Sequence, residues 1–244
     1  MFFARDKLSR NVLVSCDHGL MIVNRFDSDQ QQNGQSQWLL DHGNVSTVET
    51  DVCLGSLVDI HDPVIFDVGA NIGTWITLMA QFKPRAQFYA FEPQSQVFQM
   101  LCGNLAINNI HNVLAYPYAI GSEDTVVTVP QPDYAKNFDF GTFSLVEKKI
   151  DTINQALTLE VRTLDTVMRL YKISRLDLIK IDVEGMDIDV LRGGNATISR
   201  YRPVIFIEHH DNRRSVKDDI VAVLDQYDYQ FEEHGNNLLC RARS

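Results

Sequence analysis

From residue 64 to residue 226, short apolar runs alternate with stretches in which apolar residues recur every three or four positions. The apolar runs predict buried β-strands at 64–68, 86–91, 112–119, 176–182 and 203–208. The periodic stretches predict helices at 72–82, 94–107, 163–172, 186–199 and 213–226. Strands that alternate with helices pair in parallel and are covered on both faces. The pattern therefore predicts a doubly wound α/β fold.

The N-terminal part of the chain follows a different pattern. Residues 11–26 alternate between apolar and polar and predict a β-hairpin, whereas residues 45–59 predict an amphipathic helix. Residues 27–37 between them are almost wholly polar and predict an exposed loop. We therefore expect residues 1–60 to form a cap of hairpin and helix that packs on a core domain, residues 61–244.

Two further regions interrupt the alternation of strands and helices. The runs 227–233 and 238–242 flank a polar turn and predict an antiparallel hairpin at the end of the chain. Between residues 121 and 161 we expect short strands at 125–129, 143–146 and 157–161. The loop 130–142 is rich in aromatic residues but too short to form a core of its own. It is either a lid that faces a substrate or an insertion packed on the surface.

A cofactor-binding motif follows the first predicted strand of the core. Asp67 ends that strand, and Gly69 and Gly73 follow it, four residues apart, before a helix begins. Glycines let a backbone approach a ligand closely, and the helix N-terminus presents free N–H groups. The acidic residue would repel a pyrophosphate, so the motif favours the cationic S-adenosylmethionine over NAD. Glu92, at the end of the next strand, stands where ribose hydroxyls are bound in folds of this kind.

Several ordered motifs together resemble those of the FkbM-family methyltransferases. They are Asp67-Val-Gly-Ala-Asn-Ile-Gly73, Phe91-Glu-Pro93, Thr163-Leu-Asp165, Asp177-Leu-Ile-Lys-Ile-Asp-Val-Glu-Gly185, Leu191-Arg-Gly193 and Pro203-Val-Ile-Phe-Ile-Glu208. The resemblance covers roughly residues 60–210. It implies a Rossmann-like class I methyltransferase fold and S-adenosylmethionine-dependent O-methylation of a sugar or natural-product hydroxyl. It also favours the lid interpretation of the loop 130–142, and the terminal hairpin is typical of this class.

The resemblance also implies roles for particular residues. The methionyl half of the cofactor is expected at Asp67, Gly69, Asn71 and Gly73, the ribose at Glu92, and the adenine near Ala119 and Ser122. Two departures from the family pattern are Asp187, where Glu is usual, and the pair His209-His210 after the fifth strand. The second departure lies near the expected acceptor, whose identity therefore stays open.

Methyl transfer to a hydroxyl requires a base, because a sugar hydroxyl is a very weak acid. Asp182 and Glu184 follow one predicted strand at i, i+2 spacing, so an extended chain points both carboxylates to one face. Glu208 and His209 follow the next strand. These four residues are the candidates for proton removal and for orienting the acceptor. Glu184 could instead cap the following helix, and either histidine could be a solvated loop residue.

A metal site is one further kind of site to consider. Asp182, Glu208 and a histidine could bind Mg²⁺ or Mn²⁺, but the acidic cluster of metal-dependent O-methyltransferases is not matched residue by residue, so we predict no metal. Lys180, within a buried strand, is expected to pair with a carboxylate.

The net charge of −10 and the lack of a basic run argue against binding to nucleic acid. No apolar stretch is long enough to span a membrane, and the four cysteines lack metal-site or CxxC spacing. We therefore expect a cytoplasmic protein.

The sequence thus predicts an S-adenosylmethionine-dependent O-methyltransferase that acts on a small molecule or glycan. An NAD-dependent oxidoreductase is one alternative, although the third glycine of its fingerprint is missing. A protein that binds the cofactor without turnover is another. The acceptor and the oligomeric state are not determined by the sequence.

Overall fold

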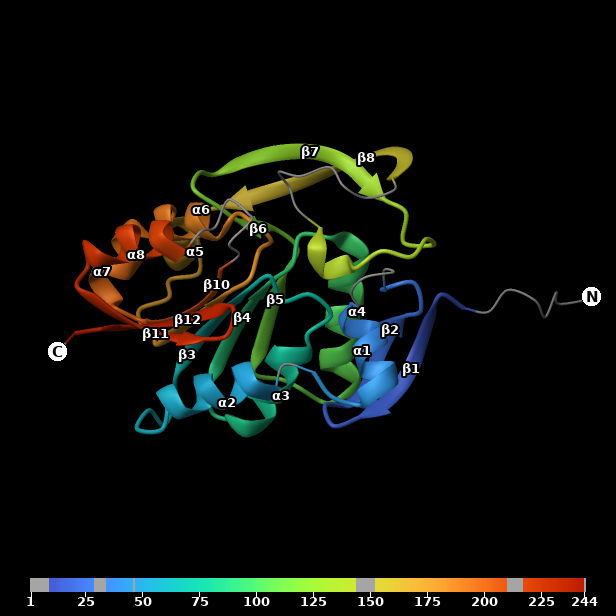
Figure 1. Cartoon of the computed structure of the whole chain (residues 1–244), viewed down its shortest axis with the longest axis horizontal. Coiled ribbons are helices and arrows are strands. Elements are labelled where there is room, and N and C mark those ends of the chain that lie inside the picture. The colour runs from blue at the N-terminus through green and yellow to red at the C-terminus, as the bar shows by residue number, and fades with distance from the viewer. Residues whose placement is uncertain (1–8, 29–33, 46, 144–151, 210–216, 244) are drawn as a thin grey trace, which may run out of the picture.

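The computed structural model describes residues 9–28, 34–45, 47–143, 152–209 and 217–243. Its central sheet has seven strands in the order β11-β12-β10-β9-β3-β4-β5 (Figure 1). These strands are β3 (Val64–Val68), β4 (Gln87–Phe91), β5 (Val113–Tyr116), β9 (Leu178–Ile181), β10 (Val204–Glu208), β11 (Tyr229–His234) and β12 (Asn237–Ala242). The five strands from β10 to β5 are parallel, whereas β11 and β12 form an antiparallel hairpin at one edge. The predicted doubly wound sheet with its terminal hairpin is confirmed.

Helices cover both faces of the sheet, because side chains along each strand alternate between two apolar clusters. On β3, Ile65 packs into one cluster and Phe66 into the other, and both are fully buried. The first cluster includes side chains of α2 (Thr47–Ser56), α3 (Thr74–Phe82) and α4 (Ser95–Ile107). The second includes side chains of α5 (Leu164–Leu170), α6 (Asp187–Arg192), α7 (Asn195–Tyr201) and α8 (Lys217–Asp225).

The predicted helix 186–199 is two helices, which meet at Gly193 and Gly194. A Cβ at Gly193 would lie 2.0 Å from the backbone oxygen of Gly121, and one at Gly194 would lie 2.7 Å from a methyl group of Leu164. The chain therefore passes too close to its neighbours for larger residues. The two glycines also weaken the helix at this point, because each costs conformational entropy.

A second sheet arches over the carboxyl ends of the central strands in the upper part of Figure 1. It has the order β6-β8-β7, with β6 (Ala119–Ile120), β7 (Thr125–Pro132) and β8 (Thr152–Arg162). The predicted strand 112–119 divides in two at Pro117, which lacks the N–H that a continuous strand would need. The predicted strand 157–161 is part of the longer β8. The predicted strand 143–146 lies outside the described residues apart from Phe143, which is not in a strand.

The N-terminal elements contain the predicted hairpin, β1 (Asn11–Cys16) with β2 (Gly19–Asn24), and the predicted helix, which is α2. The exposed loop predicted at 27–37 is wrong at its C-terminal end, because α1 (Gln35–His42) begins there. Asp27 is fully buried, and its carboxylate accepts hydrogen bonds from the backbone N–H groups of Ser36 and Phe140, each at 2.8 Å. This long-range pairing keeps a polar segment inside the molecule.

The aromatic loop 130–142 is largely core rather than lid. Tyr134, Phe138 and Phe140 are buried in a third apolar cluster, together with side chains of β2, α1 and α4. The rings of Tyr134 and Phe140 pack edge to face, with ring centroids 5.1 Å apart. These three aromatic side chains therefore fasten the N-terminal elements to the core and do not face a substrate.

Candidate active site

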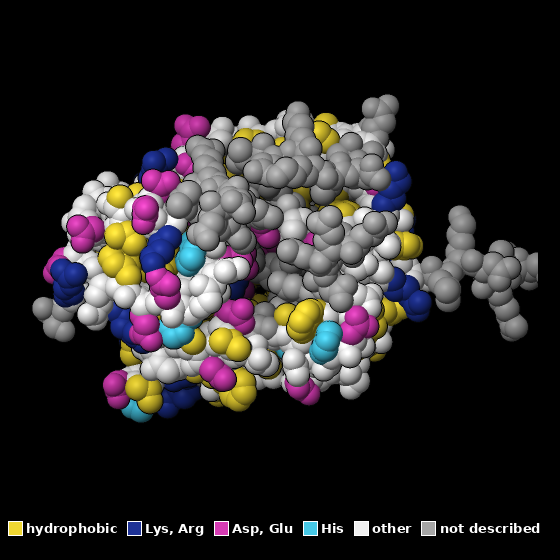
Figure 2. All heavy atoms as spheres, in the orientation of Figure 1, with side chains coloured by type: hydrophobic (Ala, Val, Ile, Leu, Met, Phe, Trp, Pro, Cys, Tyr) yellow, Lys and Arg dark blue, Asp and Glu magenta, His cyan; other side chains and the backbone are white. Residues whose placement is uncertain are grey.

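The main cavity lies at the carboxyl ends of β3, β4, β9 and β10, where ligands bind in open α/β sheets. Its volume is about 190 Å³. Figure 2 shows a hollow near the middle of this face with acidic side chains at its edge. A neighbouring inner cavity of about 180 Å³ lies on the other side of Gly69 and Asp182, towards α2 and α3. Both cavities are also lined by Gln35 and Glu208.

The glycine motif forms the turn between β3 and α3. Gly69 and Gly73 have φ of +89° and +88°, a conformation that L side chains rarely adopt. A Cβ at Gly69 would lie 1.9 Å from the backbone oxygen of Asp182, so the close approach of the chain after β9 itself requires glycine. Asn71 also has a positive φ, of 50°, and its side-chain oxygen accepts a hydrogen bond from Ile72 N–H.

The residues predicted to bind the cofactor do not all lie together. Gly69, Asn71, Glu92 and Ala119 line the main cavity. Asp67 lies beneath it and lines the inner cavity instead. The remaining two, Gly73 and Ser122, line neither cavity, and Ser122 is exposed.

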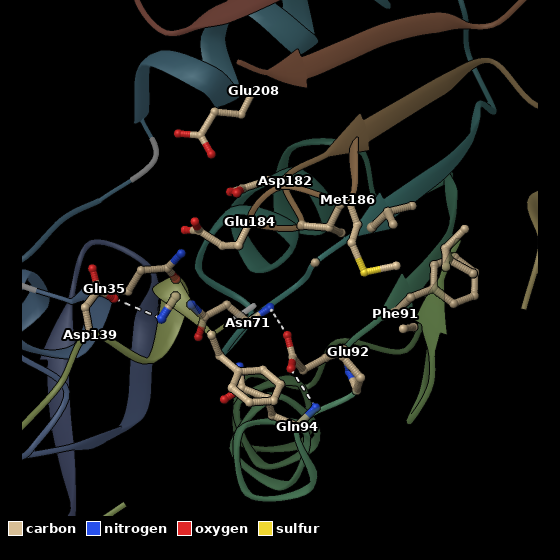
Figure 3. Close-up of a pocket in the computed structure, with 18 residues that line it drawn as sticks. Gln35, Asn71, Phe91, Glu92, Gln94, Asp139, Asp182, Glu184, Met186 and Glu208 are labelled. Carbon is tan, nitrogen blue, oxygen red and sulfur yellow. Dashed lines mark hydrogen bonds between the residues drawn. The ribbon is translucent and has the colours of Figure 1, made fainter. Parts of the chain in front are cut away.

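Glu92 is held in a fixed position at the floor of the main cavity. Its two carboxylate oxygens accept hydrogen bonds from the backbone N–H groups of Asn71, at 3.0 Å, and Gln94, at 2.8 Å (Figure 3). Each oxygen has a second lone pair, so the carboxylate can accept two further hydrogen bonds from a ribose. Burial raises the pKa of Glu92 to about 7, although the hydrogen bonds from Gln94 and Asn71 oppose the shift.

Apolar side chains line one end of the main cavity. Phe91 ends β4, Ile120 ends β6, and Met186 precedes α6. Figure 3 shows Phe91 on the side of Glu92 that lies away from the acidic residues, and Met186 between Phe91 and Asp182. A flat adenine ring between apolar surfaces, with its ribose at a buried carboxylate, fits this arrangement.

Three carboxylates lie at the opposite end of the main cavity. Asp182 follows β9, Glu184 lies in the turn after it, and Glu208 ends β10. One oxygen of each lies within 4.8 Å of the others, and Figure 3 shows the three groups directed to the same side, towards Gln35. Oxygen ligands of this kind suit a divalent cation or a hydroxyl acceptor. The structure thus brings together three of the four predicted catalytic residues.

The alternative role of Glu184 as a helix cap does not agree with the structure. Helix α6 begins at Asp187, with Met186 in the cap position. It is the Asp187 carboxylate that accepts hydrogen bonds from the backbone N–H groups of Val183 and Gly185, each at 3.2 Å. Glu184 has a φ of +53°, and its side chain lines the cavity. Asp187, which stands where Glu is usual, therefore stabilises the turn that presents Glu184.

Lys180 supplies a positive charge behind the acidic cluster, as the sequence predicted. Its Nζ lies 3.1 Å from Oδ2 of Asp182 and 3.8 Å from Oδ1 of the fully buried Asp67. Burial would lower the pKa of Lys180, but Asp182 and Asp67 raise it above its usual value. Burial raises the pKa of Asp67 to about 6, although Lys180 opposes this shift.

His209 lines neither cavity, and its backbone N–H donates to the carbonyl of Asn236 at 2.8 Å. His210 lies outside the described residues. Sequence reasoning missed Gln35 and Asp139, which enter the main cavity from the N-terminal elements and from the aromatic loop. Gln35 accepts a hydrogen bond from the Thr74 hydroxyl at 2.7 Å, and Asp139 accepts one from Gly141 N–H. The sequence offers one signal for Asp139, which lies two residues before a glycine. It offers none for Gln35, which is one of several glutamines in a polar segment.

Similarity to known proteins agrees with this site. The methyltransferase FkbM domain matches residues 67–231. "Methyltransferase 1" of Beauveria bassiana is 29% identical over 145 residues, which are 54% of this chain and 58% of that protein. The 2-O-methyltransferase NoeI of Sinorhizobium fredii is 26% identical over 167 residues, 64% of this chain and 67% of NoeI. The hexuronic acid methyltransferase AglP of Haloferax volcanii is 27% identical over 132 residues, 54% of this chain and 50% of AglP.

The chain thus spans half to two thirds of the length of these relatives. The fold is also that of a solved FkbM methyltransferase from Methylobacillus flagellatus KT, with a TM-score of 0.52 and 16% identity. That likeness covers 74% of this chain and 44% of the other. The domain match alone includes more than half of the sequence. The chain therefore belongs to the FkbM family of methyltransferases, with S-adenosylmethionine as its methyl donor.

Proposed function

We propose that this methyltransferase transfers its methyl group to a hydroxyl of a small molecule or glycan. The observation that carries the proposal is the group of three carboxylates at one end of the main cavity, opposite the apolar end. The names of two relatives, a 2-O-methyltransferase and a hexuronic acid methyltransferase, support oxygen and a sugar as the target. Membership of a methyltransferase family removes the support for an NAD-dependent oxidoreductase.

We infer the position of the cofactor from the chemistry of the two ends of the main cavity. Phe91, Ile120 and Met186 would hold the adenine, and Glu92 the ribose hydroxyls. The methionyl half would then lie along Gly69 and Asn71, which brings the sulfur towards the acidic cluster. When bound, S-adenosylmethionine supplies a methyl carbon activated by a positively charged sulfur.

The acidic residues would perform the proton transfer. Lys180 already neutralises Asp182, so Glu184 and Glu208 are the better proton acceptors, and we assign the base to Glu184. Its carboxylate takes the proton of the acceptor hydroxyl while the oxygen forms its bond to the methyl carbon. The electron pair of the broken carbon–sulfur bond stays on sulfur, so the products are an ether and S-adenosylhomocysteine. Asp182 and Glu208 would orient the acceptor through hydrogen bonds.

The experiment is methyl transfer from labelled cofactor to a panel of glycosides and hydroxylated small molecules, with products analysed by mass spectrometry and NMR. A methyl ether on one hydroxyl, absent with the matching deoxy compound, is expected. A methyl group on nitrogen or carbon would contradict the proposal. Cofactor binding without transfer to any compound would favour the catalytically silent alternative.

Two features bear on where the enzyme works. None of the helices in the described segments is long and apolar enough to cross a membrane. All four cysteines are free thiols, which supports a reducing compartment such as the cytoplasm.

A further inference from the structure

The inner cavity is built mainly from polar and charged groups and takes residues from distant parts of the chain. Glu49 comes from α2, Asp67 from β3, Thr74 and Trp75 from α3, and Asn237 from the start of β12. It meets the main cavity at Gln35, Gly69, Asp182 and Glu208. The acidic cluster therefore stands between two chambers of similar volume. A two-substrate enzyme needs two adjacent sites that meet where the group is transferred.

Two buried groups at the inner cavity have polar atoms that the described residues do not satisfy. The indole N–H of Trp75 has no acceptor, although the side chain is only 2% exposed. Both carboxylate oxygens of Asp67 also lack a hydrogen-bond donor, and the nearest positive charge is Lys180 Nζ at 3.8 Å. Buried polar groups are seldom left without partners in native proteins. A donor and an acceptor among the residues that line one cavity suit a ligand that offers both, as a hydroxyl does.

The charge of the inner cavity limits which hydroxyl compounds can enter. Among the described residues, its lining contains the carboxylates of Glu49, Asp67, Asp182 and Glu208 but one ammonium group, that of Lys180. Lys180 lies against Asp67 and Asp182, so its charge is already shared between two carboxylates. A ligand with a carboxylate or phosphate would add a further negative charge to this enclosed space, where charges are poorly screened.

We propose that the inner cavity is the acceptor subsite, that it holds an uncharged polyhydroxy ring, and that it discriminates against the corresponding uronic acid. This inference rests on the proposed function, because it assigns the second chamber to the acceptor of the same reaction. Trp75 donates to a ring hydroxyl and Glu49 accepts from one, while Asp182 and Glu208 face the hydroxyl that reacts. On this basis the acceptor differs in charge from the hexuronic acid named for the Haloferax volcanii relative.

The two tryptophans of the chain allow a direct binding test. Trp38 is 43% exposed and lies outside both cavities, so a Trp38→Phe protein leaves Trp75 as the sole reporter. With S-adenosylhomocysteine present, methyl glucopyranoside, galactopyranoside and mannopyranoside are titrated against the matching uronic acids. At least one neutral glycoside is expected to change the Trp75 emission in a saturable way, and to bind about tenfold or more tightly than its uronate.

A matched pair of substitutions on α2 tests the cause of the discrimination. Glu49→Gln removes a charge from the cavity wall and is expected to tighten uronate binding several-fold, with little change in cofactor affinity by calorimetry. Asp51→Asn removes an exposed charge two residues away on the same helix and is expected to change neither.

Three results would overturn the inference. They are equal or tighter binding of the uronates, no emission change with any neutral glycoside, and a loss of S-adenosylhomocysteine affinity in Glu49→Gln. The last would assign the inner cavity to the cofactor. Failure of the proposed function is seen separately, as a methyl group recovered on an atom other than oxygen.

Discussion

Substitution of Glu92 should lower cofactor affinity, whereas substitution of Glu184 should lower turnover. Glu92→Ala removes the acceptor of the ribose hydroxyls, and charge-assisted hydrogen bonds of this type contribute about 1.5–3 kcal/mol. We expect cofactor affinity to fall roughly tenfold to 150-fold, because about 1.4 kcal/mol corresponds to one decade. Glu92 also accepts from the backbone of Asn71 and Gln94, so unfolding free energy should fall as well, by about 1–3 kcal/mol.

Glu184→Gln keeps the shape of the side chain and removes the proposed base. We expect kcat to fall by about 10²- to 10⁴-fold, with the affinity for S-adenosylhomocysteine nearly unchanged. The melting temperature should also stay the same, because Asp187 rather than Glu184 stabilises the turn before α6. Each variant is the control for the other.

The assay is calorimetric titration of S-adenosylhomocysteine, thermal melting and turnover on the same preparations. Normal turnover by Glu184→Gln would refute its assignment and pass the role to Glu208 or Asp182. Unchanged cofactor affinity in Glu92→Ala would refute the position assigned to the ribose.

Three further predictions concern the same site. Cofactor-free protein should lose stability as pH rises from about 4 to 7. Burial raises the pKa values of Asp67 and Glu92 to about 6 and 7, so the folded state binds more protons than the unfolded state over this range. A melting temperature that rises steadily over this range in wild type, but not in Glu92→Gln, would contradict this sign. Gly69→Ala should destabilise the fold by more than about 3 kcal/mol in urea unfolding, because the added Cβ meets the Asp182 carbonyl and φ is positive. Gly55→Ala is the control and should not destabilise the fold, because there is open space around Gly55. Equal stabilities of the two variants would show that the turn relaxes. Turnover should survive exhaustive dialysis against EDTA, because Lys180 already balances Asp182, and restoration of lost activity by Mg²⁺ would instead establish a metal role for the three carboxylates.

The central sheet could be predicted because its signals are local. A run such as Val64–Val68 is apolar except for Asp67, and a glycine follows it, so period and length define the strand. The division at Pro117 and the break at Gly193 also follow from the chemistry of single residues. Gly69, Asn71 and Glu92 were found because their spacing along the chain reflects the strand–turn–helix geometry that brings them together.

The parts that were missed depend on contacts between distant segments. The helix α1 begins in a polar segment whose burial depends on Asp27, and the partner of Asp27 at Phe140 is more than a hundred residues away. The sequence shows that the loop 130–142 is aromatic, but it does not show that the loop packs against side chains of β2, α1 and α4. Gln35, at the start of α1, reaches the cavities because of this packing, and no local pattern distinguishes it from a surface residue. Trp75 packs instead in the cluster of α2, α3 and α4 side chains, and no local pattern distinguishes it from a core residue.

The Asp27 carboxylate, which bonds the backbone of Ser36 and of Phe140, has a practical consequence for recombining this enzyme with its relatives. The FkbM domain match starts at residue 67, whereas Gln35 and Glu49, which line the inner cavity, lie before it. Exchanging only the first 60 residues would replace Asp27 itself, and an incoming segment without a carboxylate at this place would leave the buried backbone N–H of Phe140 without its acceptor. A chimera that exchanges residues 133–143 together with the N-terminal elements preserves this contact. The two segments should therefore be exchanged together when the acceptor preference of a relative is to be introduced into this chain.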